Sequence, residues 1–356
     1  MRVAISGGGT GGHISPAIAV AEAIWDKYPD TRIDFIATPR PVDRRMYYKF
    51  GDTVHILNPP RMDRGIVDVA LLPFRAAREF FKVRKLLRKL GSSVLFATGG
   101  YPSFFPVVAA CSLGIPSIIH ESNSIPGRAN RLASRFSDIV LTGFSSAASG
   151  FKKMATYSGN PVRSSLERYA RSFAREKLNV PDGIPVVLFL GGSQGARAIN
   201  DTALKAPENV CVLLQCGSRD RERINEESSD LPRIHVIDFT DDPALLYSAA
   251  DIAVARSGSM TVAELTWFRI PAVYIPLPSA ADDHQKWNAL EIADKGGALV
   301  YLQDSTDADS LWRTISGLLC DDRTIQRMKT SLEEIMPVNP AGTIAEIVIS
   351  TAGEGL

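Results

Sequence analysis

A glycine-rich stretch near the N-terminus constrains the fold of this chain more than any other feature. Residues 6–17 read Ser-Gly-Gly-Gly-Thr-Gly-Gly-His-Ile-Ser-Pro-Ala and follow a short apolar segment at residues 2–5. Closely spaced glycines permit left-handed backbone and leave no Cβ between the amide N–H groups and a ligand. A helix is expected from Ser15 or Pro16 through Trp25, with its N-terminus facing the loop, which suits a phosphate. The stretch therefore predicts a strand, a turn and a helix, the opening of a βαβ unit.

The pattern of an apolar segment that runs into a glycine turn occurs again further along the chain. It returns at residues 94–101, 186–197 and 252–261. Short strands that alternate with helices indicate an α/β fold with parallel sheets. A chain of 356 residues is long enough for two domains, which we place at residues 1–160 and 161–340.

Charge is divided unevenly between the two halves. Residues 1–165 carry 22 Lys and Arg against 11 Asp and Glu, whereas the remainder is net acidic. A basic half suits phosphates, nucleic acid or an anionic membrane surface. The four cysteines have no paired spacing and are expected to be reduced thiols in a cytosolic protein. We expect neither a signal peptide nor a membrane-spanning segment.

A basic amphipathic helix is predicted over residues 74–90, after Pro73. Its apolar stripe holds Ala76, Phe80, Val83, Leu87 and Leu90, and its basic stripe holds Arg75, Arg78, Lys82, Lys85 and Lys89. The segment is either a core helix with a solvated basic face or a helix on a membrane surface. The periodicity by itself leaves both interpretations open.

Polar side chains also end a predicted strand at residues 117–119, in the sequence His120-Glu121-Ser122-Asn123. The carboxyl ends of parallel strands are where ligand sites form, so these groups are candidates for a site. The alternative is that they cap the following helix and one another.

A nicotinamide dinucleotide fold is one rival interpretation of the first glycine turn. Gly7, Gly9 and Gly12 satisfy G-x-G-x-x-G. A dinucleotide site expects an acid at the end of the second strand to bind the ribose, and residues 36–38 read Ile-Ala-Thr. An NADP-binding form of this fold, which would use Arg40 beyond the second strand, remains only a minor alternative.

The acidic half offers a second anion site. Helix starts at residues 192–195 and 257–261 could hold one diphosphate from two sides. Glu264 would then accept from a ribose hydroxyl pair, or it caps the helix start as the partner of Thr261 in a Thr-x-x-Glu box. The spacing fits both roles.

Taken together, seven ordered motifs resemble the MurG family of glycosyltransferases. They are residues 7–13, 99–101, 120–123, 159–163, 191–200, 256–264 and 284–289. The resemblance implies a GT-B fold, in which two Rossmann-like domains with parallel sheets face one another across a cleft. It implies inverting transfer of N-acetylglucosamine from UDP-GlcNAc to lipid I, giving lipid II for peptidoglycan synthesis. A related UDP-sugar transferase acting on another lipid, such as diacylglycerol, is the alternative.

The same resemblance implies site residues. Donor-binding residues would be Arg163, Ser193, Gln194, Asn200, Ser259, Met260, Thr261, Glu264, Gln285 and Asn288. Acceptor-binding residues would be Gly9, Thr10, Gly11, Gly12, His13, Tyr101, Asn123 and Asn130. Membrane contacts would come from Phe80, Phe81, Lys82, Lys85 and Leu87, so the resemblance favours the membrane interpretation of this helix. The last helix, about residues 341–356, would pack back on the first domain.

The expected partners are UDP-GlcNAc, a lipid-linked pyrophosphate, an anionic membrane at its cytoplasmic face, and cell-wall synthesis or division proteins. We expect no nucleic acid, no metal site and no cofactor. His13 is the candidate general base, because a helix N-terminus disfavours its charged form; the alternative is that it only binds the acceptor phosphate. Glu121 and His120 are reserve candidates. A catalytically silent nucleotide-sugar binding protein is the rival from another class.

One segment departs from the family pattern. Residues 38–43 read Thr-Pro-Arg-Pro-Val-Asp, where a Gly-Thr-x-x-Gly-x-Glu type of segment is expected. The departure lies on the acceptor side, so it bears on acceptor choice more than on the donor.

Overall fold

The computed structural model forms two compact units. The first comprises Met1–Ser164 and Pro337–Leu356, and the second comprises Ser165–Met336. The structure describes residues 1–59, 66–181, 183–192, 195–237, 240, 242–303 and 307–354, without the side chains of residues 66–72 and 354.

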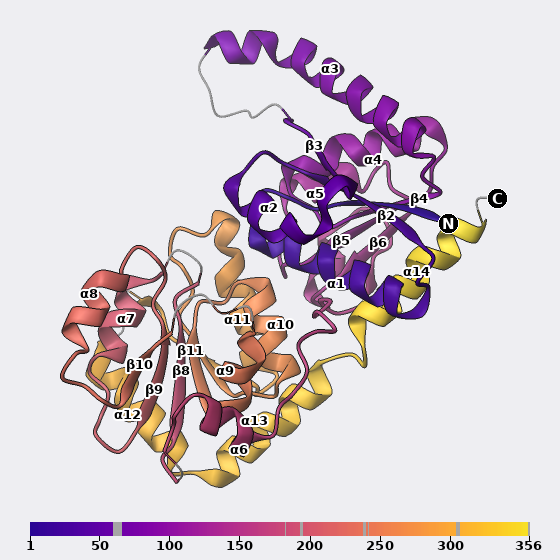
Figure 1. The fold of residues 1–356 in the computed structure, drawn as a ribbon. Helices are drawn as coiled ribbons and strands as arrows, with labels where there is room; N and C mark the ends of the chain where they lie inside the picture. The colour runs from indigo at the N-terminus through magenta and orange to yellow at the C-terminus, as the bar shows by residue number, and fades with distance from the viewer. Residues whose placement is uncertain are drawn as a thin grey trace. The chain divides into compact units, whose positions relative to one another are not determined.

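The first unit is built on a parallel sheet of seven strands (Figure 1). These are β1 (Arg2–Ser6), β2 (Arg32–Ala37), β3 (Val54–Ile56), β4 (Val94–Ala97), β5 (Ser117–Glu121), β6 (Ile139–Thr142) and β7 (Thr156–Tyr157). Their order is β3-β2-β1-β4-β5-β6-β7, so the direction of winding reverses between β1 and β4. That reversal is the point at which doubly wound sheets bind ligands.

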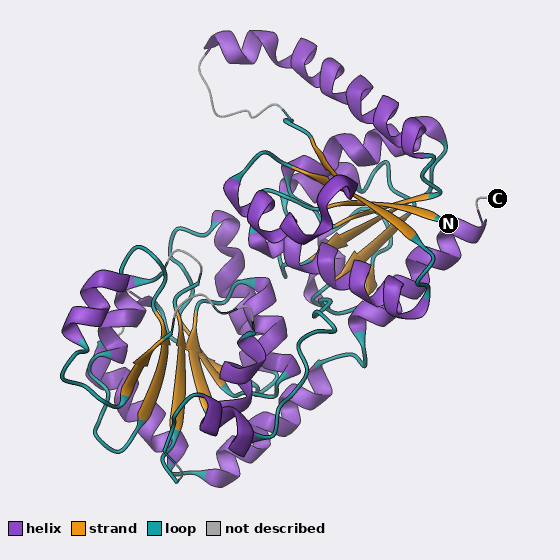
Figure 2. Cartoon of the chain, in the orientation of Figure 1, coloured by secondary structure: helices purple, strands orange, loops and turns teal. Residues whose placement is uncertain are grey.

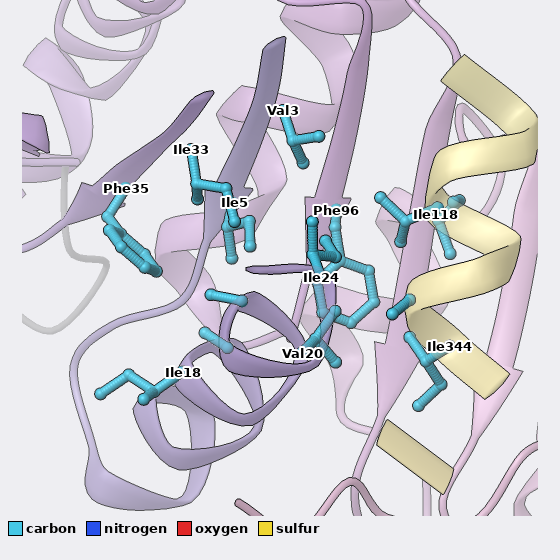
Figure 3. Packing of buried hydrophobic residues seen from close by; sticks show 14 of the residues in the cluster. Val3, Ile5, Ile18, Val20, Ile24, Ile33, Phe35, Phe96, Ile118 and Ile344 are labelled. Atoms are coloured by element: carbon cyan, nitrogen blue, oxygen red, sulfur yellow. The ribbon is translucent and has the colours of Figure 1, made fainter. Parts of the chain in front are cut away.

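Helices cover both faces of this sheet. They are α1 (Gly11–Lys27), α2 (Pro41–Met46), α3 (Ile66–Leu90), α4 (Tyr101–Leu113), α5 (Arg128–Ala133) and α14 (Pro340–Glu354), with short 3₁₀ turns η1 (Tyr48–Thr53) and η2 (Ser146–Gly150). Alternating strand residues point to opposite faces, so Val3 and Ile5 pack under α1 while Ala4 packs under α3 and α4. Figure 3 shows Ile344 of α14 beside Ile118 in the first of these two cores.

The second unit repeats the design with a parallel sheet of six strands. These are β8 (Val186–Leu190), β9 (Cys211–Gln215), β10 (Ile234–Val236), β11 (Ile252–Ala255), β12 (Ala272–Tyr274) and β13 (Ala298–Val300), in the order β10-β9-β8-β11-β12-β13. Its helices lie on both faces (Figure 2): α6 (Arg171–Lys177), α7 (Arg197–Ala203), α8 (Arg221–Glu227), α9 (Pro243–Ala249), α10 (Ser259–Trp267), α11 (His284–Asp294), α12 (Ala308–Leu319) and α13 (Asp322–Ile335), with the 3₁₀ turn η3 (Ala281–Asp283). The reversal here lies between β8 and β11.

The predicted fold class, α/β with parallel sheets in two Rossmann-like units, is confirmed. Two helix starts were predicted wrongly. Helix α1 begins at Gly11, because Thr10 is the extended N-cap residue and the first turn accepts two glycines. Helix α3 begins at Ile66 and continues through Pro73, which removes one N–H from the helical ladder without ending the helix.

Candidate functional site

Two glycine turns meet at the carboxyl ends of β1 and β4. The backbone N–H of Thr98 donates to the carbonyl of Ser6 at 2.9 Å. The Thr98 hydroxyl donates to the carbonyl of His13 at 2.6 Å, and the Ser103 hydroxyl donates to the carbonyl of Gly99 at 2.8 Å. The two Thr98 bonds tie the start of α1 to the turn before α4, so the turns predicted separately form one surface.

His13 lies in the first turn of α1, on this surface. Its Nδ1 is 3.1 Å from the carbonyl oxygen of Thr98. A carbonyl oxygen only accepts, so Nδ1 carries the proton, and the neutral ring then has its lone pair on Nε2. A Cβ on Gly100 would lie 2.9 Å from Nε2, and Gly100 has φ +75°. A glycine is therefore required beside the imidazole.

The loop after β1 is held by a carboxylate that sequence reasoning missed. The Asp43 side chain is fully buried and accepts the N–H of Gly9 at 3.0 and 3.1 Å and the N–H of Thr38 at 2.7 Å. The Tyr47 hydroxyl donates to the carbonyl of Gly7 at 2.6 Å, and burial raises the pKa of that hydroxyl well above its usual value. The segment at residues 38–43, treated as a departure from the family pattern, is thus the support of the glycine loop. The signal for Asp43 in the sequence is an acidic residue that closely follows the second strand.

Arg40 and Tyr101 border the same loop. The Nη1 of Arg40 donates to the carbonyl of Gly9 at 2.7 Å, and its guanidinium carbon lies 5.6 Å from the centre of the Tyr101 ring. Thr10 is exposed, and it is followed by the first-turn N–H groups of Gly11 and Gly12, which have no partner within the helix. The predicted acceptor residues from Gly9 to His13 and Tyr101 are therefore neighbours in space.

The polar groups after β5 serve as supports. Glu121 is 1% exposed, and its carboxylate accepts from the N–H of Asn123, the N–H of Gly127 and the amide of Asn130. These bonds cap the α5 region, as the capping interpretation predicts. Asn130 also packs against Gly99, whose Cβ would lie 2.4 Å from its Nδ2.

His120 is likewise fully buried. Its Nε2 donates to the carbonyl of Gly159 at 3.0 Å, and its Nδ1 lies 3.3 Å from the Ser122 hydroxyl. Burial lowers the pKa of His120 to about 4. A buried ring with both nitrogens in contact with the protein suits a structural role.

The glycine turn after β8 is shaped by its backbone. The N–H of Gly195 donates to the carbonyl of Gly192 at 3.0 Å, and a Cβ on Gly195 would lie 2.4 Å from the carbonyl oxygen of Cys216. Asn200, which is predicted to bind the UDP-sugar, is fully buried. Its side-chain amide donates to that same carbonyl at 3.0 Å and to the Asp220 carboxylate at 2.8 Å. Ser193 and Gln194 lie outside the described residues.

The second turn of this unit leads from β11 into α10. Gly258 is its N-cap residue, and no side chain caps the helix, so Thr261 lies inside it and the Thr-x-x-Glu capping interpretation is wrong. Ser259 and Met260 form the first turn. Glu264 accepts from the Tyr247 hydroxyl at 2.6 Å, an orienting contact that the sequence did not reveal.

The remaining predicted donor residues have different settings. Asn288 is fully buried and donates to the carbonyl of Ser257 at 3.1 Å, so it supports the loop before α10. Gln285 is half-buried and accepts from the N–H of Leu277 at 3.0 Å. Arg163 belongs to the first unit, and its buried Nε has no hydrogen-bond partner among the described residues.

The described residues contain no group of three or more His, Cys, Asp or Glu side chains that could hold a metal ion. None of the described helices combines the length and apolarity that crossing a membrane requires.

Known proteins resemble this chain over nearly its full length. A UDP-N-acetylglucosamine--N-acetylmuramyl-(pentapeptide) pyrophosphoryl-undecaprenol N-acetylglucosamine transferase of Acetivibrio thermocellus is 32% identical, with 98% of this chain and 97% of the relative covered. The protein of the same name from Salinibacter ruber is 34% identical, with 99% and 97% covered. The crystal structure of Acinetobacter baumannii MurG superposes with a TM-score of 0.79 at 28% identity, covering 98% of this chain and 99% of that one.

A more distant structure, UDP-GlcNAc 2-epimerase from Neisseria meningitidis, shares the fold with a TM-score of 0.66 at 14% identity. The profile of the glycosyltransferase family 28 N-terminal domain matches residues 3–142, and that of the C-terminal domain matches residues 186–339. The two matches fall on the two units, one on each sheet. The chain therefore belongs to glycosyltransferase family 28, within the MurG family of GT-B enzymes.

Proposed function

We propose that this protein transfers N-acetylglucosamine from UDP-GlcNAc to a polyprenyl-pyrophosphoryl N-acetylmuramyl pentapeptide, with inversion at the sugar carbon. The observation that carries the proposal is His13, held in the Nδ1–H tautomer beside two glycine turns at the switch point of the first sheet. The names of the curated relatives support the donor and the acceptor.

The chemistry follows from these groups. The acceptor hydroxyl attacks the sugar carbon, His13 Nε2 takes the hydroxyl proton, and the bond to the diphosphate breaks so that UDP leaves with its electron pair. A neutral imidazole in the first helical turn suits proton removal near neutral pH. Amide N–H groups at the start of α10 stabilise the negative charge that develops on the departing diphosphate. No step needs a metal or another cofactor.

Each unit has its own ligand in this proposal. The loop from Gly9 to Gly12 and Tyr101 binds the acceptor pyrophosphate in the first unit. In the second, Ser259, Met260 and Thr261 bind the donor diphosphate through helix amides. Glu264 binds the ribose in the orientation that Tyr247 sets. Gln285 binds the sugar hydroxyls. The family resemblance assigns Arg163 of the first unit to the diphosphate, and the buried Nε of this residue has no hydrogen-bond partner among the described residues.

A transfer assay tests this function. Radiolabelled UDP-GlcNAc and UDP-glucose are each offered with the pyrophosphoryl-linked muramyl acceptor and with diacylglycerol. We expect label only in the first pairing of donor and acceptor. Label in diacylglycerol would replace the proposal with the other lipid acceptor, and label in neither would indicate a silent nucleotide-sugar binding protein.

The role of His13 has its own test. Replacement His13→Gln should lower kcat by about a hundredfold to ten-thousandfold, the usual contribution of a general base. Acceptor KM should change little. A kcat within a few-fold of the native value would leave His13 as a phosphate ligand only.

We further propose that α3 places the protein on the cytoplasmic face of the membrane. Phe74 and Phe81, seven residues apart on one helix face, are 76% and 64% exposed, and Lys82 and Lys85 beside them are also exposed. Apolar side chains ringed by cations suit an anionic lipid surface. Leu87 is excluded from this surface, because it is fully buried in the core beneath α3, and Phe80 packs partly against the same core.

Vesicle binding tests the membrane proposal. Reversal of both charges in Lys82→Glu/Lys85→Glu should weaken sedimentation with phosphatidylglycerol vesicles by at least tenfold, since each Lys near such a surface contributes about 1 kcal/mol. The matched control reverses two exposed lysines of the second unit, Lys177 and Lys205. Equal loss in both variants would contradict a binding face on α3.

A further inference from the structure

Arg40 stands out among the groups that the proposed chemistry does not use. It precedes α2 and reaches back over the glycine loop after β1, where its Nη1 donates to the carbonyl of Gly9 at 2.7 Å. A guanidinium carries five N–H donors, and this bond uses one of them. Among the described residues, no carboxylate forms an ion pair with Arg40.

The orientation of this guanidinium is set by an aromatic ring. The carbon of the group lies 5.6 Å from the centre of the Tyr101 ring. A guanidinium that lies over an aromatic ring keeps edge donors available, in a fork that matches phosphate oxygens. A Cβ on Gly9 would lie 3.4 Å from the Tyr101 ring and 3.9 Å from Arg40 Nη1, so all three residues border one spot.

Positive potential gathers at this spot from two further sources. The first-turn N–H groups of α1 follow directly at Gly11 and Gly12, and the N-terminal end of that helix dipole faces the loop. The negative charge nearby belongs to Asp43, which is fully buried and bound to the N–H groups of Gly9 and Thr38. Arg40 is half-exposed, so its charge is available to a ligand in solvent.

We propose that Arg40 binds the pyrophosphate of the acceptor and makes the site selective for a diphosphate over a monophosphate. The loop amides and the start of α1 hold one phosphate, and the Arg40 fork holds the other. The inference rests on the proposed function, because it takes the glycine loop as the acceptor site. The inference also explains why residues 38–43 can depart from the family pattern. This segment supplies Asp43, which supports the glycine loop, and Arg40, which supplies the cation beside it.

The test uses two dead-end analogues, a short prenyl pyrophosphate and the matching prenyl monophosphate, as competitors of the acceptor. The native enzyme should bind the pyrophosphate more tightly. In Arg40→Met the inhibition constant of the pyrophosphate should rise by about tenfold to a hundredfold, the effect of losing hydrogen bonds to a charged group. That of the monophosphate should rise less than about threefold, and Arg40→Lys should restore part of the difference.

Two controls separate recognition from folding. Arg44→Met removes the same charge from an exposed position on helix α2, which follows Arg40, and should leave both inhibition constants unchanged. UDP affinity and the melting temperature check that each variant is folded, and Arg40→Lys gives the measurement if Arg40→Met does not fold.

The outcomes are distinct. An equal rise for both analogues would show that Arg40 only holds the loop through Gly9, and unchanged constants would remove it from the site; either result overturns the inference. A native enzyme that transfers no sugar to the pyrophosphoryl-linked acceptor would instead overturn the proposed function.

Discussion

The two glycine turns at the sheet reversals have the same sequence pattern but are held in different ways. After β1, side chains distant in sequence hold the loop: Asp43 binds its N–H, and Tyr47 and Arg40 bind its carbonyls. After β8, the turn closes on its own backbone and packs on Cys216, whose carbonyl Asn200 also binds. The glycines specify the shape of a turn, whereas residues elsewhere in the fold decide which charges surround it.

The largest effect should come from removing the carboxylate beneath the first loop. Asp43→Asn keeps the size of the side chain but turns one acceptor into a donor that faces N–H groups. We expect the free energy of unfolding of the first unit to fall by about 4 kcal/mol, because bonds from two buried N–H groups to a charge are weakened or lost. Hydrogen exchange of the β1 and β4 amides measures this fall in the free energy of unfolding.

The matched change in the second unit is Asn200→Ala, which removes two hydrogen bonds from the amide of Asn200. Its expected cost in β8 and β9 is about 2 kcal/mol, since one bond goes to a neutral carbonyl and the other to Asp220, whose carboxylate keeps its pairing with Arg223. A cost equal to or above that of Asp43→Asn would contradict the contrast drawn between the loops.

The next effect is a difference between the units in how their stability depends on pH. His120 is neutral in the folded first unit because burial lowers its pKa to about 4, whereas the ring titrates near 6.5 when unfolded. The contribution of the neutral His120 ring to the free energy of unfolding is present in full above pH 6.5. It is lost as the pH falls toward 4, because the unfolded chain then binds the proton more tightly than the folded chain does. The loss should reach about 3 kcal/mol at pH 4.

The variant His120→Gln isolates that contribution, since other groups titrate equally in both proteins. Hydrogen exchange of the β5 and β6 amides is measured at pH 7.5 and at pH 4.5. Between these two pH values, the free energy of opening should fall more in the native protein than in the variant. The second unit holds a half-buried His235, whose pKa burial also lowers. Parallel slopes for native and variant in β5 would contradict the assignment.

The smallest effect concerns the donor side. Tyr247→Phe removes only the hydroxyl that donates to Glu264, so the carboxylate loses one of the contacts that orient it. UDP affinity should fall by about three- to tenfold, the value of one such hydrogen bond. The control Tyr301→Phe removes another paired hydroxyl of the same unit, which lies 2.5 Å from that of Thr314.

A second ligand sharpens this test. Binding of 2′,3′-dideoxy-UDP should be the same for native protein and Tyr247→Phe, because the hydroxyl pair that Glu264 would accept is missing. A loss for that ligand as large as for UDP would assign Tyr247 to packing and not to ribose recognition.

Local pattern predicted the sheets well, because buried parallel strands are short apolar runs and the turns after β1, β4, β8 and β11 carry glycine. It did not assign β13, α12 or α13, whose residues carry no glycine turn or site motif. It misplaced the start of α1, because glycine weakly opposes helix while tertiary packing decides.

The site was predicted less completely, for a physical reason. Motif residues such as His13 and Glu264 lie where local sequence puts them, at helix starts after strands. Their partners Thr98 and Tyr247 are 85 and 17 residues away, and Asp43 is 34 residues from Gly9. Such pairs depend on strand order, which no local pattern contains.

The position of α14 has a consequence for how the protein is made. Ile344, Ala345 and Val348 of this helix are buried in the core that α1 and the first sheet share, and Lys27 pairs with Glu346. The ribosome must synthesise the whole of the second unit before these residues exist. The first half of the chain therefore emerges with an open apolar flank, and its core is completed only by a segment that is translated after the second unit.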